Sequence, residues 1–246
     1  MLMKKLIVAN WKMNPKTAEK AEVLFREARK VKKEAIEAVI CSPFSFLYLG
    51  RGITLGAQDC FWEREGAFTG EVSPAMLKSA GVKYVLVGHS ERRRNLGETD
   101  EMVNKKIKAV LKEGLYPILC VGSEERGQDG EFRKIKNQLK KSLSGIKKAG
   151  LKKLVIAYEP IWAISTTKGR VNATPGRAGE GGNFIRKILI GLFDKESAGK
   201  VRIIYGGSVD SNNIRGFLKG GGMAGALVGA ASLEAGEFGR IIRAAL

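Results

Sequence analysis

The sequence predicts an α/β fold in which eight parallel strands close into a single (β/α)8 barrel. Short runs rich in Val, Ile and Leu alternate with helix-length segments along the chain, and its 246 residues contain no linker that would divide them into two domains. The expected strands are Leu6–Asn10, Ala38–Cys41, Ile53–Ala57, Tyr84–Gly88, Ile118–Gly122, Val155–Tyr158, Arg202–Tyr205 and Ala226–Val228. Residues 1–246 therefore form one barrel domain.

Helices are expected between these strands, several of them opening on Ser, Thr or Pro. They span Thr17–Lys33, Thr99–Glu113, Glu131–Ser144, Pro175–Leu192 and Ser211–Lys219. One of them is weakened by the glycines Gly176, Gly179, Gly181 and Gly182. Because each glycine disfavours a helix by about 1 kcal/mol relative to alanine, the first half of Pro175–Leu192 is expected to fray.

The composition limits the classes of function. Three scattered cysteines and the single histidine His89 favour neither a disulfide framework nor a protein zinc site. The chain has no long apolar span and no signal-like amino terminus, so we expect a soluble cytoplasmic protein without membrane contacts.

The formal charge of +18 favours anionic partners, either nucleic acid, an acidic surface or a phosphorylated small molecule. Much of the excess lies in helical stretches such as 26–33 and 133–153, where lysine usually marks a solvated face. No RNA-binding motif with interleaved aromatic residues accompanies it, so a nucleic-acid partner is not expected.

Glu159 directly follows a predicted strand and precedes Pro160. At the carboxyl end of a barrel strand its carboxylate would be partly desolvated, which suits a general base. The alternative is an ion pair with a nearby lysine, and spacing alone does not decide between the two.

His89 follows the predicted strand Tyr84–Gly88 and comes immediately before Ser90-Glu91-Arg92-Arg93, which is typical of a capped helical turn. The positive end of that helix would favour the neutral imidazole, which can donate a hydrogen bond to a substrate oxygen. A purely structural histidine is the alternative interpretation.

Asn10 and Lys12 end the first predicted strand two residues apart, so both point to the same side of an extended segment. Lys12 could hold a phosphate or an enolate, although a lysine there is more often simply solvated. Gly206-Gly207-Ser208 and Gly229-Ala230-Ala231-Ser232 follow the last two strands, where backbone N–H groups can approach an anion closely.

Five motifs at different strand ends together resemble one family, the triosephosphate isomerases. They are Asn10-Trp11-Lys12-Met13-Asn14, Val87-Gly88-His89-Ser90-Glu91-Arg92-Arg93, Ala157-Tyr158-Glu159-Pro160-Ile161-Trp162-Ala163-Ile164, Tyr205-Gly206-Gly207-Ser208-Val209 and Leu227-Val228-Gly229. They occur in the right order over nearly the whole chain, which is far more specific than any one of them.

The resemblance implies an aldose-ketose isomerase of glycolysis and gluconeogenesis that needs no cofactor and no metal. It would interconvert dihydroxyacetone phosphate and D-glyceraldehyde 3-phosphate through an enediolate, with Glu159 as the base and neutral His89 as the electrophile. Lys12 and Asn10 would stabilise the oxyanion, with Glu91 fixing Lys12.

By the same resemblance, a phosphate is bound and a lid covers it. The phosphate-binding amides would belong to Ser165, Ser208, Gly229 and Ala230. The lid would comprise Pro160, Ile161, Trp162, Ile164, Ser165, Thr166, Thr167 and Lys168.

Three departures from the family pattern affect this site. The lid reads Ile164-Ser165-Thr166-Thr167-Lys168 where the family usually has Ile-Gly-Thr-Gly-Lys, the stretch 169–172 is longer, and Ala230 replaces a glycine. Wherever such a backbone needs a positive φ, a non-glycine residue costs on the order of 1 kcal/mol. We therefore expect weaker substrate binding with the chemistry retained.

The connection Gln58–Gly70 is long for a βα loop and contains Phe61, Trp62 and Phe68, which it cannot easily bury alone. In the resembling family this loop inserts into a second subunit, which implies a homodimer in which Gln58, Phe68 and Thr69 belong to the dimer loop. Thr69 would lie near the partner's active site.

Other functions are compatible with parts of the pattern. Another phosphosugar enzyme could share the fold and the phosphate turns. The basic charge could instead serve a nucleic-acid-binding protein, whose affinity would fall steeply with salt, or could steer a dianionic substrate, so that kcat/KM would fall with salt.

Overall fold

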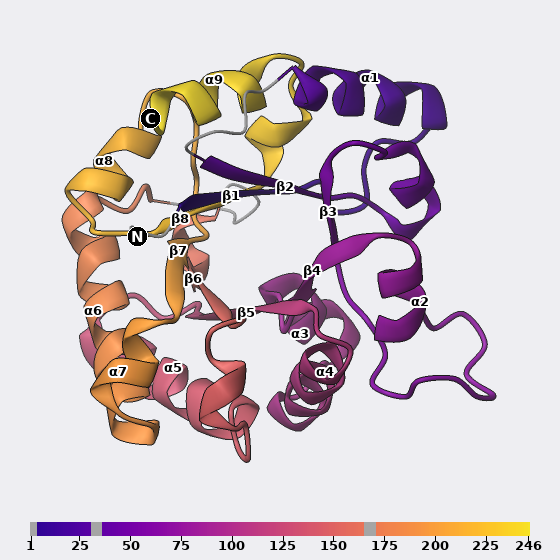
Figure 1. Ribbon diagram of the computed structural model, residues 1–246. Coiled ribbons are helices and arrows are strands. Elements are labelled where there is room, and N and C mark those ends of the chain that lie inside the picture. The colour runs from indigo at the N-terminus through magenta and orange to yellow at the C-terminus, as the bar shows by residue number, and fades with distance from the viewer. Residues whose placement is uncertain (1–3, 31–35, 165–170) are drawn as a thin grey trace.

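In the computed structural model, which describes residues 4–30, 36–164 and 171–246, eight parallel strands form a closed barrel in sequence order (Figure 1). The strands are β1 (Lys5–Asn10), β2 (Ile36–Cys41), β3 (Thr54–Ala57), β4 (Val82–Val87), β5 (Tyr116–Ser123), β6 (Val155–Pro160), β7 (Arg202–Tyr205) and β8 (Gly225–Val228). β8 pairs with β1 and closes the ring. The predicted barrel is confirmed, and each predicted strand overlaps an observed one.

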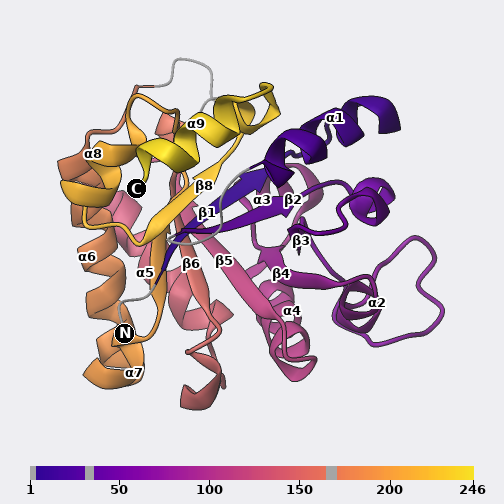
Figure 2. The ribbon, with the colours of Figure 1, turned by 45° about the horizontal axis from the view of Figure 1, so that its top comes forward.

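Helices surround the barrel on its outside, as Figures 1 and 2 show from two directions. They are α1 (Ala18–Arg29), α2 (Pro74–Ser79), α3 (Ser90–Leu96), α4 (Asp100–Lys112), α5 (Gln128–Ser142), α6 (Pro175–Leu192), α7 (Lys195–Gly199), α8 (Ile214–Lys219) and α9 (Glu237–Ala244). Among the described residues, no helix has both the length and the apolar composition needed to cross a membrane.

Alternation along the strands divides the core into two layers. Leu6 and Val8 pack inside the barrel, whereas Ile7 and Ala9 pack outside it against the helices. On β6 the interior row is Val155 and Ala157, and the next residue in that row is Glu159. The same alternation that fills the barrel therefore directs Glu159 to the interior at the carboxyl end.

The predicted fraying of the first half of Pro175–Leu192 is wrong, because α6 is continuous from Pro175. Thr174 caps it by accepting a hydrogen bond from the Arg177 N–H. The glycine at position 181 allows the helix to pack directly on the barrel, since a Cβ there would lie 2.3 Å from Tyr158 Cε1. Close packing on the barrel compensates for the poor helix propensity.

Replacing Gly181 with alanine should destabilise the fold by about 1–3 kcal/mol, because the added methyl group overlaps a buried ring that has no room to move. Gly191→Ala on the same helix is the matched control, since a Cβ at Gly191 meets nothing within 4 Å. It should be neutral or stabilising by up to about 1 kcal/mol. Urea denaturation of both variants checks this, and equal effects would contradict the packing argument.

Candidate active site

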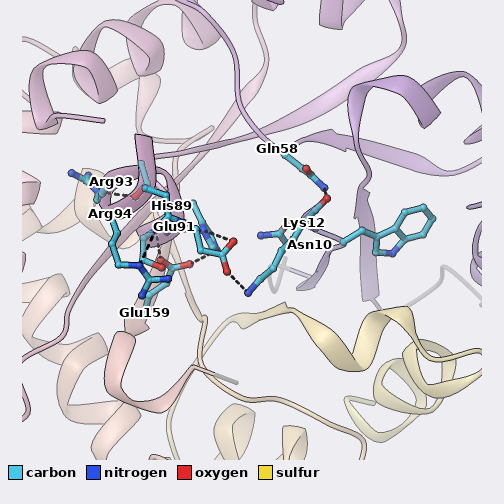
Figure 3. Close-up of polar contacts among 12 residues, drawn as sticks. Asn10, Lys12, Gln58, His89, Glu91, Arg93, Arg94 and Glu159 are labelled. Atoms are coloured by element: carbon cyan, nitrogen blue, oxygen red, sulfur yellow. Dashed lines mark hydrogen bonds and ion pairs between the residues drawn. The ribbon is translucent and has the colours of Figure 1, made fainter. Parts of the chain in front are cut away.

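Four side chains from three strand ends form a connected polar row on one rim of the barrel (Figure 3). Lys12 Nζ lies 2.6 Å from Glu91 Oε1, and Glu91 Oε2 lies 3.8 Å from His89 Nδ1. His89 Nε2 in turn lies 3.1 Å from Glu159 Oε1. The ammonium, the imidazole and the carboxylate predicted from sequence therefore meet within one small region.

His89 is the N-cap of α3, and its Nδ1 accepts a hydrogen bond from the Glu91 N–H at 3.3 Å. Because Nδ1 is occupied by this hydrogen bond, Nε2 is the ring nitrogen directed at the site, 3.1 Å from Glu159 Oε1. Nε2–H is the group available to polarise a carbonyl oxygen.

Glu159 is 1% exposed, and its two carboxylate oxygens have different environments. Oε2 accepts a hydrogen bond from the Ser90 N–H at 3.1 Å, at the amino terminus of α3. Oε1 accepts no hydrogen bond with acceptable geometry from the described residues. Gly206 provides the space, because a Cβ there would lie 2.9 Å from Glu159 Cγ. A buried, unsatisfied carboxylate oxygen suits a general base.

Lys12 is held in a left-handed backbone conformation, with φ at 54°, the only non-glycine residue with positive φ among those described. The Asn10 side-chain oxygen accepts from its N–H at 3.0 Å, and Gln58 Nε2 donates to its carbonyl at 2.8 Å. Such a conformation costs about 1–3 kcal/mol, so these neighbours fix the direction of the ammonium against strain.

Glu91 stays ionised beside this lysine. Its burial acts to raise the pKa of its carboxyl, but the hydrogen bond from Lys12 and the nearby positive charge outweigh burial and lower the pKa. The expected contact between Glu91 and Lys12 is thus present as a charge-assisted hydrogen bond at the edge of the site.

Lys12→Gly should separate stability from activity. Glycine adopts φ near 54° without steric cost, so we expect stabilisation by up to about 1 kcal/mol together with a large loss of turnover. Lys16→Gly is the comparison, because Lys16 is exposed on the same loop and does not have a positive φ. Thermal unfolding and initial rates measure both effects, and a variant that lost stability would contradict the strain at Lys12.

A depression of about 240 Å³ lies beside the ends of β7 and β8. Three of the predicted phosphate-binding residues, Ser208, Gly229 and Ala230, line it. Asn172 and Asn213 also line it, and the sequence did not single them out. The predicted residues Ser165, Thr166, Thr167 and Lys168 lie outside the described residues, so three of four predicted phosphate ligands can be placed.

Two features of this depression differ from the expectations. Ala230 begins a 3-10 turn (Ala230–Leu233) and does not have a positive φ, so the backbone strain anticipated there is absent. Both the N–H and the hydroxyl of Ser208 donate to the Ala163 carbonyl, at 3.2 and 3.1 Å. The Ser208 amide is therefore engaged by the start of the predicted lid rather than directed into the depression.

The described part of the predicted lid, residues 160–164, contacts two other segments of the chain. Ile161–Ala163 forms a 3-10 turn after Pro160, and the Val171 N–H donates to the Trp162 carbonyl at 3.2 Å. The Arg126 guanidinium lies 5.5 Å from the centre of the Trp162 ring. Trp162 therefore contacts both of these residues.

Comparison with known proteins shows the family to which the chain belongs. A family model described as triosephosphate isomerase matches residues 5–245. The chain belongs to the triosephosphate isomerase family. Among the proteins named triosephosphate isomerase, those of Dictyoglomus turgidum and Citrifermentans bemidjiense are each 45% identical over 98% of this chain, covering 100% and 99% of their own lengths. That of Thermoanaerobacter pseudethanolicus is 45% identical over 96% of this chain and covers 98% of its own length.

The sequence did not reveal the contacts that several residues of this protein make at the site. Ser90 binds the Glu159 carboxylate through its backbone N–H, which no residue type signals. Glu131 is fully buried and bridges the Tyr158 hydroxyl and Arg177, behind the strand that carries Glu159. Gln58 contacts its own chain at Lys12 and Cys41, besides lying at the start of the predicted dimer loop.

Proposed function

We propose that this protein interconverts dihydroxyacetone phosphate and D-glyceraldehyde 3-phosphate in the cytoplasm. The observation that carries the proposal is the grouping of Lys12, Glu91, His89 and Glu159, each within 4 Å of the next, together with membership of the family. An ammonium, a neutral N–H donor and a buried carboxylate are the groups needed to move a proton between adjacent carbons beside a carbonyl.

In the proposed reaction, Glu159 Oε1 removes a proton from the carbon next to the carbonyl, and the C–H electron pair forms the carbon–carbon double bond of an enediolate. The carbonyl π electrons move to oxygen, where His89 Nε2–H and Lys12 Nζ stabilise the negative charge. His89 Nε2–H gives its proton to this oxygen and takes the hydroxyl proton of the neighbouring oxygen in return. Glu159 then returns its proton to the former carbonyl carbon, and the neighbouring C–O bond becomes the new carbonyl, so that atoms and electrons balance through proton transfers alone.

Phosphate binding requires a rearrangement at Ser208. Its N–H is available to a phosphate only after the hydrogen bond to the Ala163 carbonyl breaks. Because Ala163 belongs to the predicted lid turn, we propose that lid closure and phosphate binding are coupled at this contact. Gly229 and Ala230 would supply the other amides, with Ser165 joining from the lid.

The direct test is conversion of D-glyceraldehyde 3-phosphate in an assay coupled to a glycerol phosphate dehydrogenase. We expect turnover without added metal or cofactor, inhibited by a planar phosphorylated hydroxamate that resembles the enediolate. A protein that folds, binds neither compound and turns over another phosphosugar instead would contradict the proposal and favour a different phosphosugar isomerase.

We also propose a homodimer. The loop between β3 and α2 projects away from the barrel (Figure 1), with Thr69 exposed and Phe68 44% exposed near its tip. A groove of about 410 Å³ beside Lys12 is lined by polar residues of the site, His89 and Glu91 among them, and by three exposed apolar side chains. These are Met13, Phe44 and Leu96, which are 92%, 40% and 63% exposed. A second copy of the loop would cover this surface.

Sedimentation at micromolar concentration tests this assembly. A dimer is expected, and Phe68→Asp should shift it towards monomer because the apolar ring that would pack on Met13, Phe44 and Leu96 is lost. Val171→Asp, at another exposed apolar side chain away from the loop, is the matched control. A monomeric parent protein would contradict the proposal.

A further inference from the structure

The opposite end of the barrel carries a further depression, which is strongly basic. Its volume is about 450 Å³, and it lies at the amino ends of the strands, away from the row that contains Glu159. The described residues that line it are Lys4, Ile36, Glu37, Ala38, Thr54, Lys83, Lys152, Lys200 and Arg202. None of the proposed catalytic residues belongs to it.

Five of these side chains are cationic, and Glu37 is the one acidic residue among the described lining. Glu37 binds two of the cations, with Lys83 Nζ at 2.6 Å and Arg202 Nη1 at 2.8 Å. Lys4 and Lys152 have no acidic partner among the described residues, and Lys200 pairs with an exposed glutamate on its own helical turn. A net charge of about +4 therefore surrounds the depression.

Aromatic side chains lie beneath two of the cations in the depression. Arg202 Nη2 donates to the Tyr84 hydroxyl at 2.7 Å, and Tyr84 is fully buried inside the barrel. Lys83 lies over the rings of Tyr84 and Tyr116, at 5.4 and 5.3 Å from their centres. The two floor cations are thus held in place before any ligand binds, which reduces the entropic cost of binding.

Glu37 is ionised, and its single negative charge does not cancel the positive charge of the depression. Burial acts to raise the pKa of its carboxyl, but hydrogen bonds from Lys83 and Arg202 outweigh burial and lower it to about 2. Each of those cations keeps further donors that Glu37 does not use. Glu37 therefore organises the two cations rather than cancelling the charge of the depression.

We propose that this depression binds a small linear polyphosphate. A terminal phosphate carries roughly one to two negative charges, so a single phosphate would leave much of the surrounding charge uncompensated, whereas a triphosphate chain would match it. The site is a concave pocket between strand ends, not an extended basic groove with aromatic platforms, which favours a short flexible anion over nucleic acid.

Binding there would join separate parts of the fold. Lys4 precedes β1, Lys83 lies in β4, Lys152 precedes β6, and Arg202 begins β7. An anion that contacts these residues simultaneously would hold the amino ends of the strands together. The expected consequence is a higher Tm in its presence, since a ligand that binds only the folded state stabilises that state.

Titration calorimetry with inorganic tripolyphosphate at about 0.15 M salt tests the proposal. We expect one site per subunit, and at least tenfold weaker binding to the double variant Lys152→Gln/Lys200→Gln. The matched control is Lys136→Gln/Lys140→Gln, which removes two exposed lysines from α5 with the same change in charge. A third variant, Lys12→Met, removes the cation of the opposite rim.

Support requires that the α5 control and Lys12→Met bind tripolyphosphate within twofold of the parent protein. Equal weakening in the α5 control would show attraction to the net charge alone, and weakening in Lys12→Met would place the anion at the catalytic rim. Either result overturns the proposal, as does no binding. Orthophosphate binding as tightly as tripolyphosphate, or a single-stranded RNA oligonucleotide binding more tightly, overturns it as well.

Discussion

Replacing Glu159 with glutamine should lower kcat by about 10²–10⁴-fold, because a carboxamide oxygen cannot take up the substrate proton. The change preserves shape at a residue that is 1% exposed, and the carboxamide oxygen can still accept from the Ser90 N–H. The groups proposed to contact the phosphate and the oxyanion are unchanged. KM should therefore change much less than kcat.

The assay needs protein from a host that lacks its own isomerase, since trace contamination would exceed the residual rate. Glu124→Gln is the matched control, because Glu124 is exposed just after the end of β5 and makes the same chemical change on the same rim. It should retain kcat within twofold. If Glu159→Gln stayed within tenfold of the parent protein, the proposed base would be wrong.

Lys106→Met should destabilise the fold by about 3–5 kcal/mol at neutral pH, because it leaves buried carboxylates short of one cation. Lys106 is 2% exposed, and its ammonium contacts Asp59 at 2.7 Å and Glu98. Arg92 reaches the same two carboxylates, at 2.8 and 3.7 Å. After the substitution, Arg92 alone would face both.

The loss should be smaller at pH 5 than at pH 7.5. Burial raises the pKa of Asp59 to about 6, with the charge of Glu98 acting in the same direction and Lys106 opposing it. The folded-state pKa exceeds the unfolded value, so the folded protein binds more protons between about pH 4 and pH 6, and ionisation of Asp59 lowers stability as pH rises through that window. Because Lys106 lowers the pKa of Asp59, its removal raises that pKa further, so the loss of stability in the variant grows as pH rises.

Guanidinium denaturation at the two pH values measures this difference. Lys108→Met, an exposed lysine two residues along the same helix, should change stability by no more than about 0.5 kcal/mol. A similar effect at both positions would show that α4 loses stability through helix composition. A Lys106→Met loss independent of pH would contradict the coupling to Asp59.

Sequence predicted the barrel and much of its rim because both follow from alternation. Val155, Ala157 and Glu159 share one face of β6, and the barrel makes that face the interior. Asn10 was predicted by the same argument on β1. His89 was selected because it precedes a predicted helical turn, and in the structure it is the N-cap residue of α3.

Other features could not be predicted because they arise from contacts between distant segments. The positive φ of Lys12 is imposed from outside, by Gln58 among others, and no property of lysine signals it. Lys106 belongs to a lysine-rich amphipathic helix and was indistinguishable from its solvated neighbours. The fraying expected for α6 ignored Tyr158, on which its glycine packs.

The residues at the start of the β3–α2 loop limit how far this loop can be shortened. Gln58 holds the backbone of Lys12 on one side of the site, and the next residue, Asp59, holds Arg92 on the other. Two adjacent positions thus hold residues on both sides of the candidate active site, whereas Phe68 lies near the exposed tip of the loop. A deletion that shortens this loop to produce a monomeric enzyme should therefore retain Gln58 and Asp59, because these two residues hold Lys12 and Arg92 in place.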